Sequence, residues 1–148
     1  MIEQHHAPVH ILMAEDNQDD VDLTREALQE SKLAINLHHV KDGVEAMAFL
    51  RKEPPFENVP RPDLFLLDLN MPRKDGRQVL EEVRADDTLK DLPVVILTTS
   101  GAEEDILSSY KRHVNCYIQK PVDFEQFLKV VGAIQDFWFA IVRLPHRH

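Results

Sequence analysis

Short apolar runs alternate with segments of helical spacing along most of the chain, and this alternation limits the fold more than any other feature. Buried strands are predicted at five runs, residues 9–14, 36–40, 63–68, 94–98 and 116–119. Apolar residues three or four positions apart predict helices near residues 18–31, 44–52, 77–85 and 102–112, and a last helix from residue 124. Strict alternation of strand and helix predicts an α/β protein with a doubly wound parallel sheet, covered by helices on both faces.

Helix-start signals support four of these helices. Asp42, Asp75, Ser100 and Asp123 are each followed three positions later by Glu or Gln. This spacing is typical of a capping box, in which the first side chain accepts a hydrogen bond from a free N–H group of the first helical turn. The signals therefore predict where the second to fifth helices begin.

Length and charge limit the functional classes. The chain has 148 residues, with 17 Lys or Arg against 26 Asp or Glu, so its net charge is −9. We expect a single domain over residues 1–148, and no direct nucleic-acid partner because this charge repels phosphates. One cysteine, Cys116, allows no intrachain disulfide, and no signal peptide or membrane-length apolar run is present. These features predict a cytoplasmic protein with no membrane association.

Chemically active side chains follow four of the predicted strands. Glu15 and Asp16 follow the first, Asp68 ends the third, Thr98 ends the fourth and Lys120 follows the fifth. Singly, each is typical of a strand boundary, a helix cap or a solvated lysine. Together they would share one edge of a parallel sheet, where crowded carboxylates favour Mg²⁺. A lysine and a hydroxyl there suit the oxygens of a phosphoryl group. Two interpretations stay open: the residues are ordinary strand boundaries and caps, or they form a magnesium-dependent phosphoryl site.

The motifs ILMAEDN, LFLLDLNMPRKDG, VVILTTS and YIQKP occur in that order, each at a strand end. With them the chain resembles the CheY-like receiver domain of two-component response regulators over about residues 9–131. The resemblance implies a flavodoxin-like (βα)5 fold with strand order 2-1-3-4-5. The proline-rich insert before the third strand and the ending KPVDFEQFLKVVGAIQDFW are similar to the small single-domain response regulators of bacterial, chiefly cyanobacterial, phytochromes.

The resemblance implies a role for each acid at the strand ends. Asp68 corresponds to the phosphoacceptor. Asp16 corresponds to a residue that binds Mg²⁺ directly, and Glu15 to one that binds it through water. Asn70 corresponds to the residue whose backbone carbonyl completes the metal site. Here the acidic pair is Glu-Asp, whereas the family pattern is Asp-Asp.

Three further residues match the family's conformational switch. Thr98 corresponds to the switch hydroxyl, Lys120 to the lysine that pairs with the phosphoryl group, and Tyr117 to the aromatic rotamer switch. The resemblance also implies a cis peptide bond at Lys120–Pro121. Phosphorylation would then alter the surface formed by the fourth helix, the fifth strand and the fifth helix.

The implied function is that of a signalling protein and not of an enzyme. A sensor histidine kinase, a phytochrome by the narrower resemblance, would transfer a phosphoryl group to Asp68, and the protein would catalyse only its own phosphorylation and dephosphorylation. A phosphatase of the haloacid dehalogenase type also uses an Asp after a strand, but it needs a second acid where Asn70 stands. A degenerate receiver that only binds a partner is the third alternative, and the set Asp16, Asp68, Thr98 and Lys120 argues against it.

The last predicted helix extends past the sheet. The receiver core is expected at about residues 9–131, with a helical extension and tail at about 132–148. Apolar residues surround this extension instead of following one face, which predicts a homodimer interface. The candidates for that interface are Trp138, Phe139, Ile141 and Val142. The alternative is that these side chains fold back onto their own domain.

Overall fold

The structure is a computed structural model that describes residues 9–29, 35–71, 73–98, 116–123, 125–127 and 129. Five parallel strands form one sheet in the order β2-β1-β3-β4-β5, as predicted. The elements, in chain order, are β1 (Val9–Ala14), α1 (Gln18–Leu28), β2 (Ile35–Val40), α2 (Gly43–Leu50), β3 (Leu64–Asp68), α3 (Gly76–Ala85), β4 (Val94–Thr98) and β5 (Cys116–Gln119). Residues 125–127, in the predicted fifth helix, are also helical.

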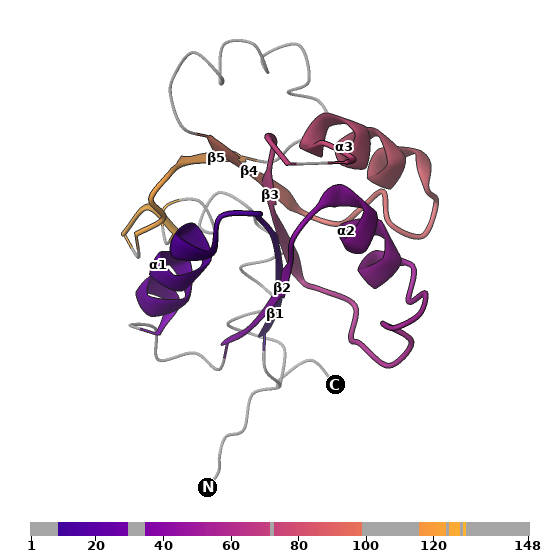
Figure 1. Ribbon diagram of the computed structural model, residues 1–148, viewed down its shortest axis with the longest axis horizontal. Helices are drawn as coiled ribbons and strands as arrows, with labels where there is room; N and C mark the ends of the chain where they lie inside the picture. Colours follow the sequence, from indigo (N-terminus) through magenta and orange to yellow (C-terminus); the bar gives the residue numbers. More distant parts are fainter. Residues whose placement is uncertain are drawn as a thin grey trace, which may run out of the picture.

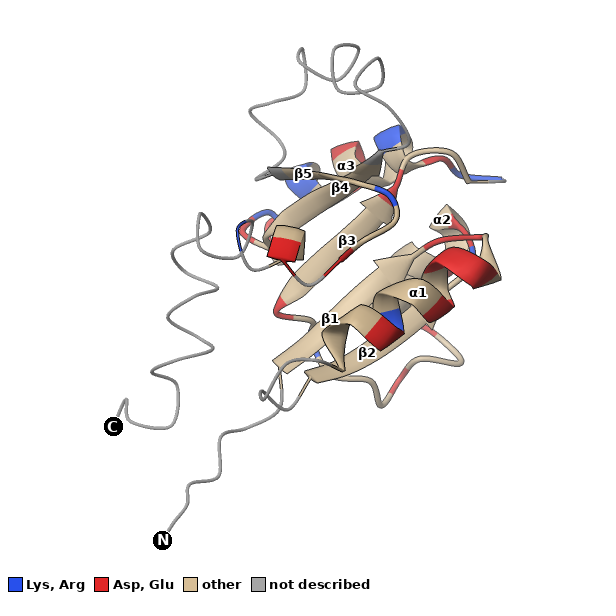
Figure 2. Cartoon of the chain, turned by 90° about the vertical axis from the view of Figure 1, so that its left-hand side faces the viewer, with Lys and Arg blue, Asp and Glu red and all other residues tan. Residues whose placement is uncertain are grey.

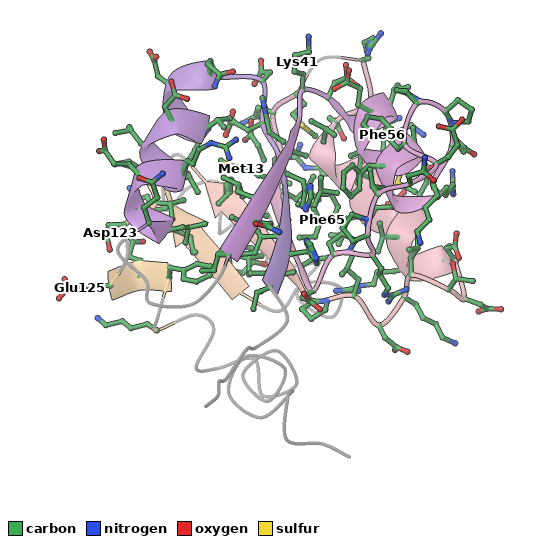
Figure 3. All side chains as sticks on the ribbon, turned by 90° about the horizontal axis from the view of Figure 1, so that it is seen from below. Met13, Lys41, Phe56, Phe65, Asp123 and Glu125 are labelled. Atoms are coloured by element: carbon green, nitrogen blue, oxygen red, sulfur yellow. The ribbon has the colours of Figure 1, made fainter. Side chains whose placement is uncertain are left out.

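Helices cover both faces of the sheet. Helix α1 lies on one side, and α2 and α3 lie on the other (Figure 1). Successive side chains of a strand point to opposite faces, so Met13 packs into the core beneath α1 while Phe65 packs into the core beneath α2 and α3. Figure 3 shows these two side chains on opposite sides of the strands. Both faces are buried, which explains why the strands are continuous apolar runs.

The register of the sheet aligns the carboxyl ends of its strands. Ala14 at the end of β1 pairs with Leu67 of β3, so the next residues along the two strands, Glu15 and Asp68, reach the same level of the edge. Asp68 in turn pairs with Leu97, the last but one residue of β4. The strand ends that carry acids in the sequence therefore lie side by side.

Capping residues define where the helices begin. Asp42 accepts a hydrogen bond from a first-turn N–H of α2, and Asp75 forms a complete capping box at α3, both as predicted. Asp123 accepts from the backbone N–H of Gln126 at 2.8 Å, which confirms the start of the fifth helix. Helix α1 begins at Gln18, as predicted, and is capped by Asn17, a residue that the sequence patterns did not single out.

Element boundaries differ from expectation by one to three residues. Helix α1 ends at Leu28, three residues before the predicted end. Strand β2 begins at Ile35 and β3 at Leu64, where residues 36 and 63 were expected. Helix α2 ends at Leu50, two residues before the predicted end. The predicted helix at 102–112, its cap Ser100 and the extension at 132–148 lie outside the described residues. No helix in the described part of the chain is long and apolar enough to cross a membrane.

Candidate functional site

Three carboxylates meet at the carboxyl edge of the sheet. Glu15 and Asp16 follow β1, Asp68 is the last residue of β3, and an oxygen atom from each lies within 4.8 Å of the other two. Glu15 and Asp68 are buried, whereas Asp16 is exposed. The sequence prediction that these acids converge is therefore confirmed by their geometry.

Lys120 lies against this acidic cluster. Its Nζ is 3.0 Å from Glu15 Oε1 and 3.7 Å from Asp68 Oδ1. A third carboxylate, Asp20 in the first turn of α1, approaches the same nitrogen at 3.1 Å. Burial lowers the pKa of Lys120, but the carboxylates around it raise the pKa by more, and the net shift is upward. Lys120 is therefore a permanent positive charge within an excess of negative charge.

Asp68 is held in an unfavourable environment for an isolated carboxylate. Burial, and then the negative charge of Glu15, raise the pKa of Asp68 to about 7, against the opposing effects of Lys120 and of a backbone hydrogen bond. That bond comes from the Asn70 N–H to Asp68 Oδ1, at 3.3 Å. Desolvation and like charge are the two causes that most disfavour an ionised carboxylate. One ammonium group does not neutralise the cluster.

The donor set of this cluster fits a hard divalent cation. Glu15, Asp16 and Asp68 offer carboxylate oxygens at a shared point, and such oxygens favour Mg²⁺ or Mn²⁺ over softer metals. A cation at that point would offset both the burial and the repulsion from Glu15 that raise the pKa of Asp68. Because Asp16 is exposed, the cluster is open to solvent on one side. Figure 2 shows the acidic residues of α1 in red on the helix beside this edge.

The loop after β3 packs closely beneath Asp68. The backbone N–H of Gly76 donates to the carbonyl of Leu69 at 2.9 Å. A Cβ atom at Gly76 would lie 2.6 Å from the backbone oxygen of Asp68, too close for any other residue without a shift of the backbone. Farther along the loop, Arg73 forms an ion pair with Asp42, the cap of α2. These contacts fix the loop that carries Asn70.

Other predicted residues fall at the same edge or outside the described part. Thr98 ends β4 in register with Gln119 of β5, and its side chain lies outside the described residues. Tyr117 is half-buried on β5 and packs against the core beneath α2 and α3. The Lys120–Pro121 peptide bond is cis, as predicted. The dimer-interface candidates Trp138, Phe139, Ile141 and Val142 lie outside the described residues.

Sequence reasoning missed two contributors to the site. Asp20 was assigned no role, although it lies in the first turn of α1 and its carboxylate reaches Lys120. Gly76 follows the cap Asp75 directly, and a glycine there has no obvious local purpose. Only the packing of the loop against Asp68 shows why a side chain is excluded. No local sequence signal identifies the role of either Asp20 or Gly76.

The fold and the site define a class of protein. A 2-1-3-4-5 parallel sheet whose edge gathers a buried aspartate, two further acids and a lysine has the architecture of a phosphoryl-accepting signalling domain. The family model of the response regulator receiver domain matches residues 11–132. The chain belongs to this family.

Relatives of nearly full length share this architecture. Response regulator Rcp1 of Synechocystis sp. is 45% identical over 145 residues, covering 98% of this chain and 99% of that protein. A crystal structure of Rcp1 in an Mn²⁺-bound form matches with a TM-score of 0.72, covering 92% of this chain and 96% of that one. A crystal structure of the phosphorylated cyanobacterial phytochrome response regulator RcpA, 50% identical, matches with a TM-score of 0.73 and covers 90% and 95% of the two chains.

Proposed function

We propose that this protein is a phosphoacceptor response regulator in which Asp68 receives a phosphoryl group from a sensor histidine kinase. The observation that carries the proposal is the position of Asp68: a buried carboxylate at a strand end, 3.7 Å from the ammonium of Lys120 and beside two other acids. A carboxylate with a purely structural role is not expected where burial and like charge disfavour its ionised form. Such a position is typical of a nucleophile that binds a cation and reacts with a phosphoryl group.

The reaction follows from the residues present. An Asp68 carboxylate oxygen attacks phosphorus, the bond between phosphorus and the kinase imidazole nitrogen breaks, and the imidazole leaves with the bonding electron pair. Lys120 donates to a phosphoryl oxygen and stabilises the charge that moves onto Asp68. Asp16 and Asp68 would hold Mg²⁺ together with the backbone carbonyl of Asn70, and Glu15 would hold it through water. When bound, the metal supplies positive charge that neutralises the phosphoryl oxygens.

The partner proposed for this reaction is a phytochrome histidine kinase. Three observations support it: the overall similarity to RcpA, described as a cyanobacterial phytochrome response regulator, the similarity to Rcp1 over the length of both chains, and the family match. A cytoplasmic location follows for a partner of such a kinase. The net charge of −9 favours protein partners over nucleic acid.

The proposed output is a change of surface. Phosphorylation adds about −1.5 to −2 charges at Asp68, Thr98 turns toward the new oxygens, and Tyr117 turns inward. The shift is between two states that already exist in the ensemble. Residues 1–148 are proposed to act as one receiver domain, which signals as a homodimer through Trp138, Phe139, Ile141 and Val142.

Acetyl phosphate tests the proposed function without knowledge of the kinase. With Mg²⁺ present, intact-mass measurement should find one added phosphoryl group on the wild-type chain. Chelation of the metal with EDTA, or the substitution Asp68→Asn, should abolish this addition. Asp87→Asn, at an aspartate whose side chain is 94% accessible and which is far from the cluster in sequence, should leave it intact. Equal phosphorylation of the Asp68→Asn and wild-type chains would show that the proposal is wrong.

A further inference from the structure

Lys120 is shared between the phosphorylation site and helix α1. Its nearest carboxylate oxygens belong to Glu15, at 3.0 Å, and to Asp20, at 3.1 Å, while Asp68 is farther away at 3.7 Å. Of the three acids, Asp20 alone is not a member of the cluster that fits the cation. The ammonium group is therefore drawn toward α1 and away from the residue that is proposed to carry the phosphoryl group.

The backbone of Asp20 is fixed at the start of α1. Its N–H donates to the Asn17 side chain at 3.1 Å, and its carbonyl accepts from the Thr24 hydroxyl at 2.9 Å. The carboxylate is partly exposed, with 23% of the side chain accessible, whereas the Lys120 side chain is only 12% accessible. Asp20 thus sits at the rim of the site, and its contact with Lys120 lies on the solvent side of the buried acids.

We propose that Asp20 is a positioning residue that competes with the phosphoryl group on Asp68 for the ammonium of Lys120. The inference rests on the proposed function, since it assigns to Asp20 a role in the same site. A cation on Glu15, Asp16 and Asp68 weakens the hold of those acids on Lys120. Asp20 keeps its hold, because it lies outside that set. The competition limits how tightly the site retains a phosphoryl group.

Asp19 provides a matched control for this role. It lies in the same first turn of α1 and carries the same charge, but it is exposed and forms no ion pair within the described part of the chain. Asp19→Asn and Asp20→Asn remove the same charge from the same helix end. Any difference between these two variants therefore reports on the contact with Lys120 and not on the helix dipole or net charge.

Beryllofluoride, a phosphoryl mimic that binds aspartate, is the probe for the test. At saturating Mg²⁺, Asp20→Asn should bind it about two- to five-fold more tightly than wild type, the range expected for a partly exposed ion pair. In the absence of beryllofluoride, the same variant should bind Mg²⁺ about two- to five-fold more weakly, because Lys120 then moves toward Glu15 and Asp68. Asp19→Asn should change neither affinity by as much, and Asp20→Glu, which keeps the charge, should restore both.

The two affinities must move in opposite directions for the inference to hold. A merely structural role for Asp20 would loosen the site and weaken both ligands. Equal effects of Asp19→Asn and Asp20→Asn, or weakened beryllofluoride binding in Asp20→Asn, would overturn the inference while leaving the function of Asp68 intact. Beryllofluoride binding that is the same in wild type and Asp68→Asn would instead overturn the proposed function.

Discussion

Two groups of ion pairs in this protein use the same chemical groups in different surroundings. One surrounds Lys120 at the edge of the sheet, and the other joins Arg51 and Lys74 to Glu82 and Asp86 beside α2 and α3. The Lys120 and Glu15 side chains are 12% and 1% accessible, whereas those of Arg51 and Glu82 are 38% and 31% accessible. Exposed pairs contribute little to stability, and buried charges are costly unless they are paired.

The charge balance of the two groups also differs. Arg51 and Lys74 face two acids, Glu82 and Asp86, so the exposed group is neutral. The buried group has a single cation, Lys120, within 4.0 Å of three acids, and Asp16 adds a fourth. A surface network of ion pairs tends to contain equal numbers of positive and negative charges. A site that binds a divalent cation instead has an excess of negative charge. The imbalance thus indicates which of the two groups has a chemical function.

Replacing a lysine of each group with methionine should give the largest difference between the groups in the free energy of unfolding. Lys120→Met leaves Glu15 buried without its partner, and we expect a loss of about 3–5 kcal/mol in the free energy of unfolding in metal-free buffer. Lys74→Met in the exposed group should cost about 0–1 kcal/mol. Urea unfolding of both variants measures the difference. Similar losses in the two would show that burial does not distinguish them.

The same pair of variants should differ in phosphoryl transfer. Lys120→Met removes a donor aimed at the developing charge, and such a loss slows a reaction by about 10²–10³-fold. Lys74→Met should retain the wild-type rate, because its ammonium pairs with Glu82 on the surface. Initial rates with acetyl phosphate at saturating Mg²⁺ provide the measurement. A Lys120→Met rate within a factor of two of wild type would remove Lys120 from the proposed mechanism.

Asp42 belongs to neither group: it caps α2 and pairs with Arg73 of the loop after β3. Burial raises its pKa, but hydrogen bonds from the backbone and Arg73 lower it by more, and the net shift is downward. Its ionised form therefore stabilises the fold above the unfolded-state pKa near 3.8, and this contribution is lost as the pH falls through the folded-state value.

Asp42→Ala should cost about 1 kcal/mol at pH 7 through the lost cap. The difference from wild type should shrink as the pH falls below about 4, because the wild-type carboxylate then becomes protonated. Urea unfolding at pH 7 and pH 3 measures both values. A difference that grows on acidification would contradict the assigned direction of the pKa shift.

The smallest effect is expected at Glu82, the acid shared by Arg51 and Lys74. Glu82→Gln removes the charge from the exposed group without changing its shape, and the loss should stay below about 1 kcal/mol. Raising the salt concentration should reduce this loss further, because exposed charges are screened. Thermal unfolding at low and high salt is sufficient to measure it. A salt-independent loss would indicate that the pair is more buried in solution.

The sequence predicted the sheet and the buried half of the site because strand ends are easily located. Continuous apolar runs mark fully buried strands, and the next polar residue must then lie at the edge, as Glu15 and Asp68 do. The start of α1 at Gln18 was predicted, but its cap Asn17 and the role of Asp20 were missed. The contact of Asp20 with Lys120 joins residues 100 positions apart, and no local pattern encodes the angle at which a helix leaves its strand. The packing of Gly76 beneath Asp68 is likewise a tertiary constraint.

The central claim is that Asp68, and no other acid of the cluster, accepts the phosphoryl group. Borohydride reduces an acyl phosphate of aspartate to homoserine, so reduction after treatment with acetyl phosphate and Mg²⁺ marks the acceptor permanently. Peptide mass spectrometry should then find homoserine at position 68 and unchanged residues at Glu15, Asp16 and Asp20. Homoserine or an equivalent reduced product at one of those three positions, with Asp68 unchanged, would contradict the account.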